Sequence, residues 1–256
     1  MKLEGKNVVV TGAAGGIGAA LARRFHAERA AGVTVADIQA APVTAVAEEI
    51  GGLAVVCDVT DETAVQELVR RAEDAHGPID VFCSNAGVAL TGDEAAPDAD
   101  WRLNWELHVM AHVYAARAVA PGMAARGSGY LVNTASAAGL LTHTGSATYA
   151  VTKHAVVAFA EWLAIAYGDR GVRVTVLCPQ AVRTAMIAGR ESGVASIDGV
   201  LSPEEVAESV VETMAREDFL ILPHPQVLDY MQRKAGDVDR WLGGMRKLRA
   251  KYPTGI

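Results

Sequence analysis

The chain has 256 residues, of which 51% are hydrophobic and 21% charged, and its formal net charge is −7. A chain of this length and composition buries enough apolar surface to fold without disulfides or metals, which excludes disordered and collagen-like proteins. The acidic balance argues against a nucleic-acid partner, because binding to phosphates favours a basic surface.

Short runs rich in valine alternate with longer stretches of helical periodicity. The short runs predict strands, because β-branched residues favour them. The predicted strands are residues 6–11, 33–37, 53–58, 79–84, 130–134 and 173–178, with a last short one at 219–222. The predicted helices are residues 16–30, 42–50, 62–76, 100–126 and 147–167, and another begins at Ser202.

Strands that are apolar throughout and joined by helices predict a parallel sheet covered on both faces. Right-handed crossovers make this a doubly wound α/β domain, in which ligands bind at the carboxyl ends of the strands. We expect one domain over residues 1–256, with a mostly parallel, seven-stranded sheet. Residues 185–201 have little periodicity and predict a lid over the substrate, and residues 225–256 predict a helical extension.

A glycine-rich turn, T-G-A-A-G-G-I-G at residues 11–18, follows the first strand and opens the first helix. Such a turn lets the backbone approach a pyrophosphate at the helix N-terminus. Asp37 ends the second strand about 20 residues on, where a carboxylate can bind a ribose. A helix cap is the alternative role for Asp37. Because Ala14, Gly15 and Ile38 carry no positive charge, Asp37 should favour NAD over NADP, whose 2′-phosphate it repels.

Tyr149 and Lys153 stand at i and i+4 of the predicted helix 147–167, so they share one face. Ser136 follows the strand at 130–134. Oxidation of an alcohol removes its hydroxyl proton, and a tyrosine can accept it near neutral pH if its pKa falls by about two to three units. An ammonium about 4 Å away supplies about 4 kcal/mol at an effective dielectric of 20, which is enough. Taken alone, the pair is more simply a helix-surface contact.

Together these motifs resemble the short-chain dehydrogenase/reductase family over roughly residues 5–184. That family has the patterns T-G-x-x-x-G-x-G, N-A-G, Ser and Y-x-x-x-K in this order. The resemblance implies a Rossmann fold and an NAD-dependent oxidoreductase that interconverts a secondary alcohol and a ketone. It implies that Tyr149 is the general acid and base, that Lys153 holds the nicotinamide ribose, and that Ser136 polarises the substrate oxygen. The residues it implies for cofactor binding are Gly12, Gly15, Gly16, Ile17, Gly18, Asp37, Asp58, Val59, Asn85, Ala86, Gly87, Tyr149, Lys153, Pro179, Val182 and Thr184.

Two positions depart from the family pattern. The family has an asparagine seven residues after a tryptophan, which kinks the long fourth helix and holds a water for proton relay. Counting from Trp101 gives His108, and Asn104 lies one turn earlier. Histidine can bond a water through one ring nitrogen, so we expect His108 to support an altered relay, with an impaired enzyme as the alternative. Gln180 replaces the glycine that usually follows Pro179, and it either lines the substrate pocket or lies at its rim.

The predicted substrate pocket is largely apolar and has little positive charge to hold a carboxylate. Its residues are Ala138, Leu141, His143, Gln180 and Met186. We therefore expect a small or medium, mostly apolar alcohol or ketone. One alternative is an NAD-binding sensor or scaffold without turnover, which His108 favours. The other is a dehydratase or epimerase that uses the same Tyr/Lys pair with tightly held NAD.

Cys57, Cys83 and Cys178 lie in apolar runs without a C-x-x-C pair, which indicates reduced, buried thiols. With no signal peptide or membrane span, the sequence predicts a cytoplasmic protein. His108 and His112 have the spacing of helical zinc ligands, but no third ligand is evident, so we expect no metal. The resemblance implies a homodimer or homotetramer formed through the fourth and fifth helices, and we expect no membrane partner.

Overall fold

The computed structural model describes residues 1–189 and 193–252. In this part of the chain, one sheet has the strand order β3-β2-β1-β4-β5-β6-β7, and all of its pairs are parallel. The strands are β1 (Asn7–Thr11), β2 (Gly32–Asp37), β3 (Leu53–Val56), β4 (Val81–Ser84), β5 (Gly129–Thr134), β6 (Val172–Leu177) and β7 (Leu220–Ile221). The predicted seven-stranded, doubly wound sheet is confirmed.

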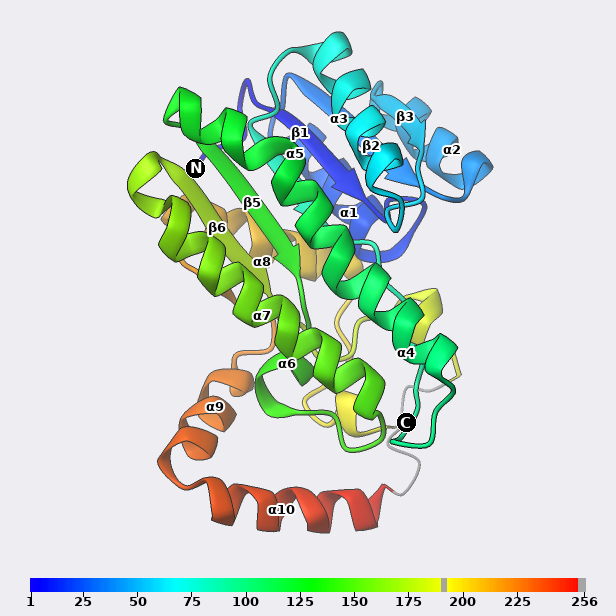
Figure 1. The fold of residues 1–256 in the computed structure, drawn as a ribbon, viewed down its shortest axis with the longest axis vertical. Helices are drawn as coiled ribbons and strands as arrows, with labels where there is room; N and C mark the ends of the chain where they lie inside the picture. Colours follow the sequence, from blue (N-terminus) through cyan, green and yellow to red (C-terminus); the bar gives the residue numbers. More distant parts are fainter. Residues whose placement is uncertain (190–192, 253–256) are drawn as a thin grey trace.

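Helices cover both faces of this sheet (Figure 1). One face carries α1 (Gly16–Ala27), α2 (Ala40–Ile50) and α8 (Pro203–Arg216), and the other carries α3 (Glu62–His76), α5 (Ala111–Arg126) and α7 (Ala147–Tyr167). In β1, Val9 packs in the core beneath α3, α5 and α7, whereas Val8 and Val10 pack on the opposite side. Successive side chains of a strand point to opposite faces, so a strand covered on both is apolar throughout.

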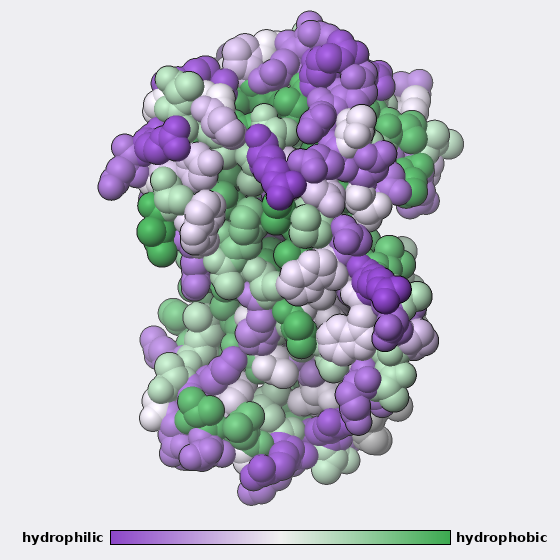
Figure 2. Space-filling view, viewed as in Figure 1, coloured by the Kyte–Doolittle hydropathy of each residue, from purple (hydrophilic) through white to green (hydrophobic). Residues whose placement is uncertain are grey.

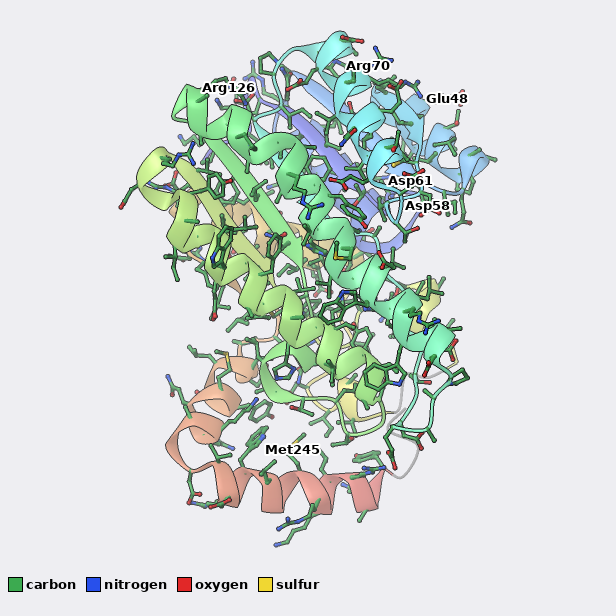
Figure 3. The ribbon with its side chains drawn as sticks, in the orientation of Figure 1. Glu48, Asp58, Asp61, Arg70, Arg126 and Met245 are labelled. Atoms are coloured by element: carbon green, nitrogen blue, oxygen red, sulfur yellow. The ribbon has the colours of Figure 1, made fainter. Side chains whose placement is uncertain are left out.

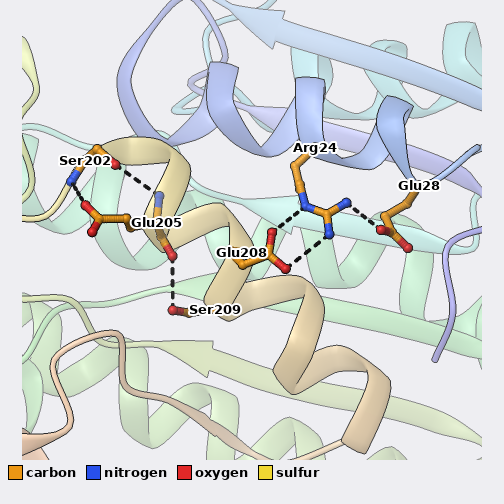
Figure 4. A network of polar contacts seen from close by, with 6 residues as sticks. All are labelled: Arg24, Glu28, Ser202, Glu205, Glu208 and Ser209. Carbon is orange, nitrogen blue, oxygen red and sulfur yellow. Dashed lines mark hydrogen bonds and ion pairs between the residues drawn. The ribbon is translucent and has the colours of Figure 1, made fainter.

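Helix α8 begins at the predicted cap and is tied to α1 by an ion pair (Figure 4). The Ser202 hydroxyl accepts a hydrogen bond from the Glu205 backbone N–H at 3.2 Å, and the Glu205 carboxylate accepts one from the Ser202 N–H at 2.7 Å. The Arg24 guanidinium donates to both carboxylate oxygens of Glu208, at 2.8 and 3.2 Å. Because both side chains of this pair reach solvent, it contributes only about 0–1 kcal/mol to stability.

The predicted helix over residues 100–126 is interrupted. Helix α4 (Asp98–Trp105) runs into a π-helical turn at Glu106–Met110, and α5 begins after that turn. Single π-helical turns inside longer helices occur frequently at functional sites. This turn carries His108. A further short helix, α6 (Ala138–Leu141), was not predicted and follows β5 directly.

Beyond β7 the chain forms α9 (Gln226–Gly236) and α10 (Val238–Lys251), which we call the C-terminal arm, residues 226–251. Figure 1 shows the arm at the end of the molecule beyond α6, with α10 lying across it. The helical pattern breaks at Asp237, whose carboxylate caps α10 by accepting the Arg240 backbone N–H at 2.9 Å. Val227 packs on α6, and Lys234 donates to the Leu140 carbonyl at 2.6 Å.

The segment 185–201 contains short 3₁₀ turns at Ala185–Ile187 and Val194–Ser196. Residues 190–192 of the predicted lid and 253–256 of the predicted extension lie outside the described residues. Cys57, Cys83 and Cys178 are buried and free, as predicted. Among the helices described, none has the length and apolar character that crossing a bilayer requires.

Candidate active site

A cavity of about 1630 Å³ lies at the carboxyl ends of the strands. Its walls come from the glycine-rich turn, the ends of the central strands, residues 185–187 and 193–198, and the C-terminal arm. Every residue predicted above for cofactor, catalysis or substrate lines this cavity except His108. The topology explains this, because parallel strands place all their carboxyl ends at one edge of the sheet.

The glycine-rich turn is tightly packed on its inner side and open toward the cavity. A Cβ at Gly12, where φ is +67°, would lie 2.7 Å from the Ala86 Cα, and one at Gly18 would lie 2.2 Å from the Gly12 carbonyl oxygen. A Cβ at Gly15 would meet no atom within 4 Å. Gly15 is the N-cap of α1, so this open space lies beside the unpaired N–H groups of the first helical turn. A pyrophosphate fits that arrangement.

Asp37 is held at the end of β2 by two backbone groups. One carboxylate oxygen accepts the Ala14 N–H at 3.0 Å, and the other accepts the Gln39 N–H at 3.0 Å. Gln39, not Asp37, is the N-cap of α2, so the alternative role of helix cap is wrong. A carboxylate oxygen can accept more than one hydrogen bond, which leaves capacity for ribose hydroxyls.

Asn85 joins the ends of three strands beneath the cavity. Its amide group donates to the Thr11 carbonyl at 3.0 Å, and its side-chain oxygen accepts a hydrogen bond from the Thr134 hydroxyl at 3.2 Å. Thr11, Asn85 and Thr134 stand at or just beyond the carboxyl ends of β1, β4 and β5. The N-A-G segment thus fixes the spacing between the glycine-rich turn and the catalytic strand.

The predicted catalytic residues come together from β5 and α7. Ser146 caps α7 by accepting the Tyr149 N–H at 3.3 Å, which places Tyr149 in the first turn. The Ser136 hydroxyl lies close enough to the Tyr149 phenol to lower its pKa. The Lys153 ammonium lies 5.6 Å from the centroid of the Tyr149 ring and donates to the Thr134 carbonyl at 3.1 Å.

Burial is the largest influence on the pKa values of both Tyr149 and Lys153. It raises the pKa of Tyr149, with Ser136 acting in the opposite direction. It also lowers the pKa of Lys153 to about 8. Desolvation of the phenol therefore opposes the lowering of the Tyr149 pKa that is expected from Lys153 and from the positive nicotinamide ring.

His108 is fully buried behind the catalytic residues and outside the cavity lining. Its ring nitrogens lie 3.0 Å from the Thr152 hydroxyl and 3.0 Å from the Val88 carbonyl oxygen. Burial, together with the charge of Lys153, lowers its pKa to about 2, so the ring is neutral. The ring also stands edge-on to Tyr149, with the centroids 5.5 Å apart. This geometry differs from the expected water relay: the histidine links α7 to the segment after N-A-G.

The lowered pKa of His108 predicts a loss of stability in acid. Below pH 6.5, the ordinary pKa of a histidine, His108 takes up a proton in the unfolded chain but not in the folded protein. The free energy of unfolding therefore decreases as the pH is lowered. From pH 7 to pH 5 this costs about 2 kcal/mol. Urea unfolding of His108→Asn should show a smaller loss by about that amount, and His112, present in both proteins, cancels. If the wild type and His108→Asn lost the same free energy of unfolding between pH 7 and pH 5, the lowered pKa of His108 would be contradicted.

Sequence reasoning missed the contribution of the C-terminal arm to the cavity. Trp241, Met245 and Leu248 line it from α10, and Figure 3 shows Met245 on the side of α10 that faces the rest of the molecule. Their helical spacing was visible in the sequence, but not the surface that they cover. Arg233 and Arg240 line the same wall, together with Asp198 and Asp237, and none of these was among the predicted pocket residues.

A doubly wound sheet with a glycine-rich turn after β1 and an acid at the end of β2 defines a Rossmann-type dinucleotide-binding domain. Residues 6–194 match the short chain dehydrogenase family. A 1-deoxy-11-beta-hydroxypentalenate dehydrogenase of Streptomyces exfoliatus is 37% identical over 94% of this chain and 90% of that protein. A meso-2,3-butanediol dehydrogenase of Serratia marcescens is 35% identical over 85% of this chain and 90% of that protein.

A solved structure also indicates the short-chain dehydrogenase/reductase family. A short chain dehydrogenase/reductase from Burkholderia phymatum, in complex with NAD, superposes with a TM-score of 0.85 at 27% identity, covering 93% of this chain and 96% of that one. The chain belongs to the short-chain dehydrogenase/reductase family. It is an oxidoreductase that acts on CH–OH groups.

Proposed function

We propose that this protein interconverts a secondary alcohol and a ketone, with Tyr149 as the general acid and base. The cofactor is NAD. The observation that carries the proposal is the meeting of Ser136, Tyr149 and Lys153 in the cavity that also contains the glycine-rich turn. Asp37 supports NAD over NADP because its carboxylate would repel a 2′-phosphate.

The roles follow from the positions of the side chains. The hydroxyls of Ser136 and Tyr149 lie near each other on the cavity wall and so can hold one substrate oxygen between them. In oxidation Tyr149 accepts the hydroxyl proton, and in reduction it returns one. Lys153 holds the nicotinamide ribose. When bound, NAD supplies the hydride acceptor and a positive ring, which favours the phenolate against the effect of burial.

A sensor or scaffold without turnover is the alternative that His108 favours, as a damaged relay residue. Both nitrogens of its ring have protein partners. Against that alternative, Ser136, Tyr149 and Lys153 are all present and line the cavity. A dehydratase or epimerase uses the same Tyr/Lys pair without net reduction of NAD. Net formation of NADH would therefore exclude this alternative, and substrate conversion without it would favour it.

The test is a panel of secondary alcohols of increasing size with NAD or NADP, followed by the absorbance of the reduced nicotinamide. We expect net reduction, with kcat/KM for NAD at least about tenfold above that for NADP, since one repelled charge at the ribose is worth more than about 1.4 kcal/mol. Substrate conversion without net reduction would overturn the proposed reaction. Equal kcat/KM values for the two cofactors would overturn the role of Asp37.

An exposed apolar face supports self-association. Leu103 and Trp105 on α4, and Val151, Trp162 and Ile165 on α7, are exposed, and Ile165 is 83% accessible. Figure 2 looks onto this helix layer and shows hydrophobic residues across its middle. Contiguous apolar surface of this kind marks protein interfaces, so we propose a homodimer or homotetramer.

The state of the three cysteines supports a reducing compartment. All three are buried and free, which fits a reducing environment. We propose that the protein acts in the cytoplasm on a small molecule, with no role in nucleic-acid binding.

A further inference from the structure

The C-terminal arm forms one wall of the cavity. Trp241, Met245 and Leu248 recur along α10 at the spacing of one helical face, and all three line the cavity. Arg233 from α9 and Arg240 from α10 line it as well. The arm therefore presents an apolar strip with two cations beside it.

The guanidinium groups of Arg233 and Arg240 are available to a ligand. Neither forms an ion pair with a carboxylate among residues 1–189 and 193–252. Arg233 lies over the Tyr230 ring, 5.8 Å from its centroid, and stacking leaves the N–H donors in the guanidinium plane free. Two acids lie on the same wall. Asp198 accepts the Tyr230 hydroxyl at 3.0 Å through one oxygen while its other, buried oxygen has no partner among the described residues, and Asp237 caps α10.

Arg240 differs from the other basic residues of α10 in lining the cavity. Arg233, Arg240, Arg246 and Lys247 are all exposed, but of the three on α10 only Arg240 lies on the wall that also holds Trp241 and Met245. Arg240 therefore belongs to the cavity wall, and Arg246 provides a matched residue on the same helix.

We propose that the substrate is an amphipathic hydroxy acid or keto acid, whose carboxylate binds Arg233 and Arg240. Its apolar body lies against the strip of Trp241, Met245 and Leu248. Arginine holds a carboxylate through two parallel N–H donors, and an apolar wall strengthens the pairing because it excludes water. The position of the reacting carbon at Tyr149 rests on the proposed function, whereas the anion site does not.

Binding tests the anion site without turnover. Decanoate and decanamide have the same chain and differ in charge, and each is titrated calorimetrically into the protein with saturating NADH. We expect decanoate to bind about tenfold or more tightly than decanamide, as charge-assisted hydrogen bonds require. The double variant Arg233→Gln/Arg240→Gln should lose this preference and Arg246→Gln should keep it. Equal binding of the two probes to the wild type, or equal losses in the two variants, would overturn the anion site.

Turnover separates this proposal from the proposed function. With 9-hydroxydecanoate and its methyl ester as substrates, we expect a KM about tenfold lower for the acid, and the double variant should abolish the difference with little change in kcat, because the arginines do not touch the reacting atoms. If neither is oxidised but decanoate binds through the arginines, the anion site stands and the proposed reaction fails. Oxidation of acid and ester with equal KM would leave the reaction in place and overturn the anion site.

Discussion

Replacement of Tyr149 by phenylalanine should lower kcat/KM for alcohol oxidation about a thousandfold, the loss expected when a general acid–base group is removed. The change deletes only the hydroxyl, which lies beside Ser136. The ring keeps its edge-on contacts with His108 and His143, at centroid distances of 5.5 and 6.2 Å, so the fold and the cofactor site should survive. NADH binding, measured by fluorescence, should therefore stay near that of the wild type.

Tyr114→Phe is the matched control for this experiment. It removes a hydroxyl from the outer side of α5, where the group lies 3.5 Å from a Glu106 carboxylate oxygen and outside the cavity lining. Its activity should equal that of the wild type. Turnover by Tyr149→Phe within tenfold of the wild type would show that another group moves the proton.

Gly18→Ala should abolish cofactor binding and destabilise the protein. The new Cβ would lie 2.2 Å from the Gly12 carbonyl oxygen and 2.8 Å from the Asn85 amide nitrogen, so the glycine-rich turn must move away from the strand that supports it. A forced backbone shift in a packed site costs about 1–3 kcal/mol, and we expect NADH affinity to fall well over tenfold. Thermal unfolding and NADH titration measure the two effects.

Substitutions at two other glycines distinguish an effect on protein packing from an effect on the space for the cofactor. Gly15→Ala meets no protein atom within 4 Å, so it should leave the melting temperature unchanged while weakening NADH binding by filling the space at the N-terminus of α1. Gly168→Ala, also in open space but at the far end of α7, should change neither property. If Gly15→Ala bound NADH like the wild type, the pyrophosphate would have to lie elsewhere.

The fold and the cofactor end were predictable because the information is local. Apolar runs such as that of β1 specify strands buried on both faces, and the turn at 11–18 carries its own geometric requirement for glycine. Asp37 could be placed because it ends a strand next to this turn. The bounds of α3 and α7 also match the ranges predicted from periodicity.

The features of the site that the sequence did not predict depend on contacts between distant segments. Counting from Trp101 located His108, but its partners Thr152 and Val88 come from other elements, and without them a relay role was the natural expectation. The direction of the Tyr149 pKa is set by desolvation, which no spacing reveals. The role of Arg240 required knowing where α10 lies, because its sequence shows only an amphipathic helix.

The C-terminal arm begins only after the last strand of the sheet, and none of the described residues of α10 is fully buried. Amino-acid exchanges on its inner side therefore cost the protein little folding free energy and are felt mainly by whatever enters the cavity. Evolution can retune ligand preference in the arm while the inherited proton and hydride chemistry stays unchanged, so sequence differences that change the substrate among relatives should concentrate in about the last eighth of the chain.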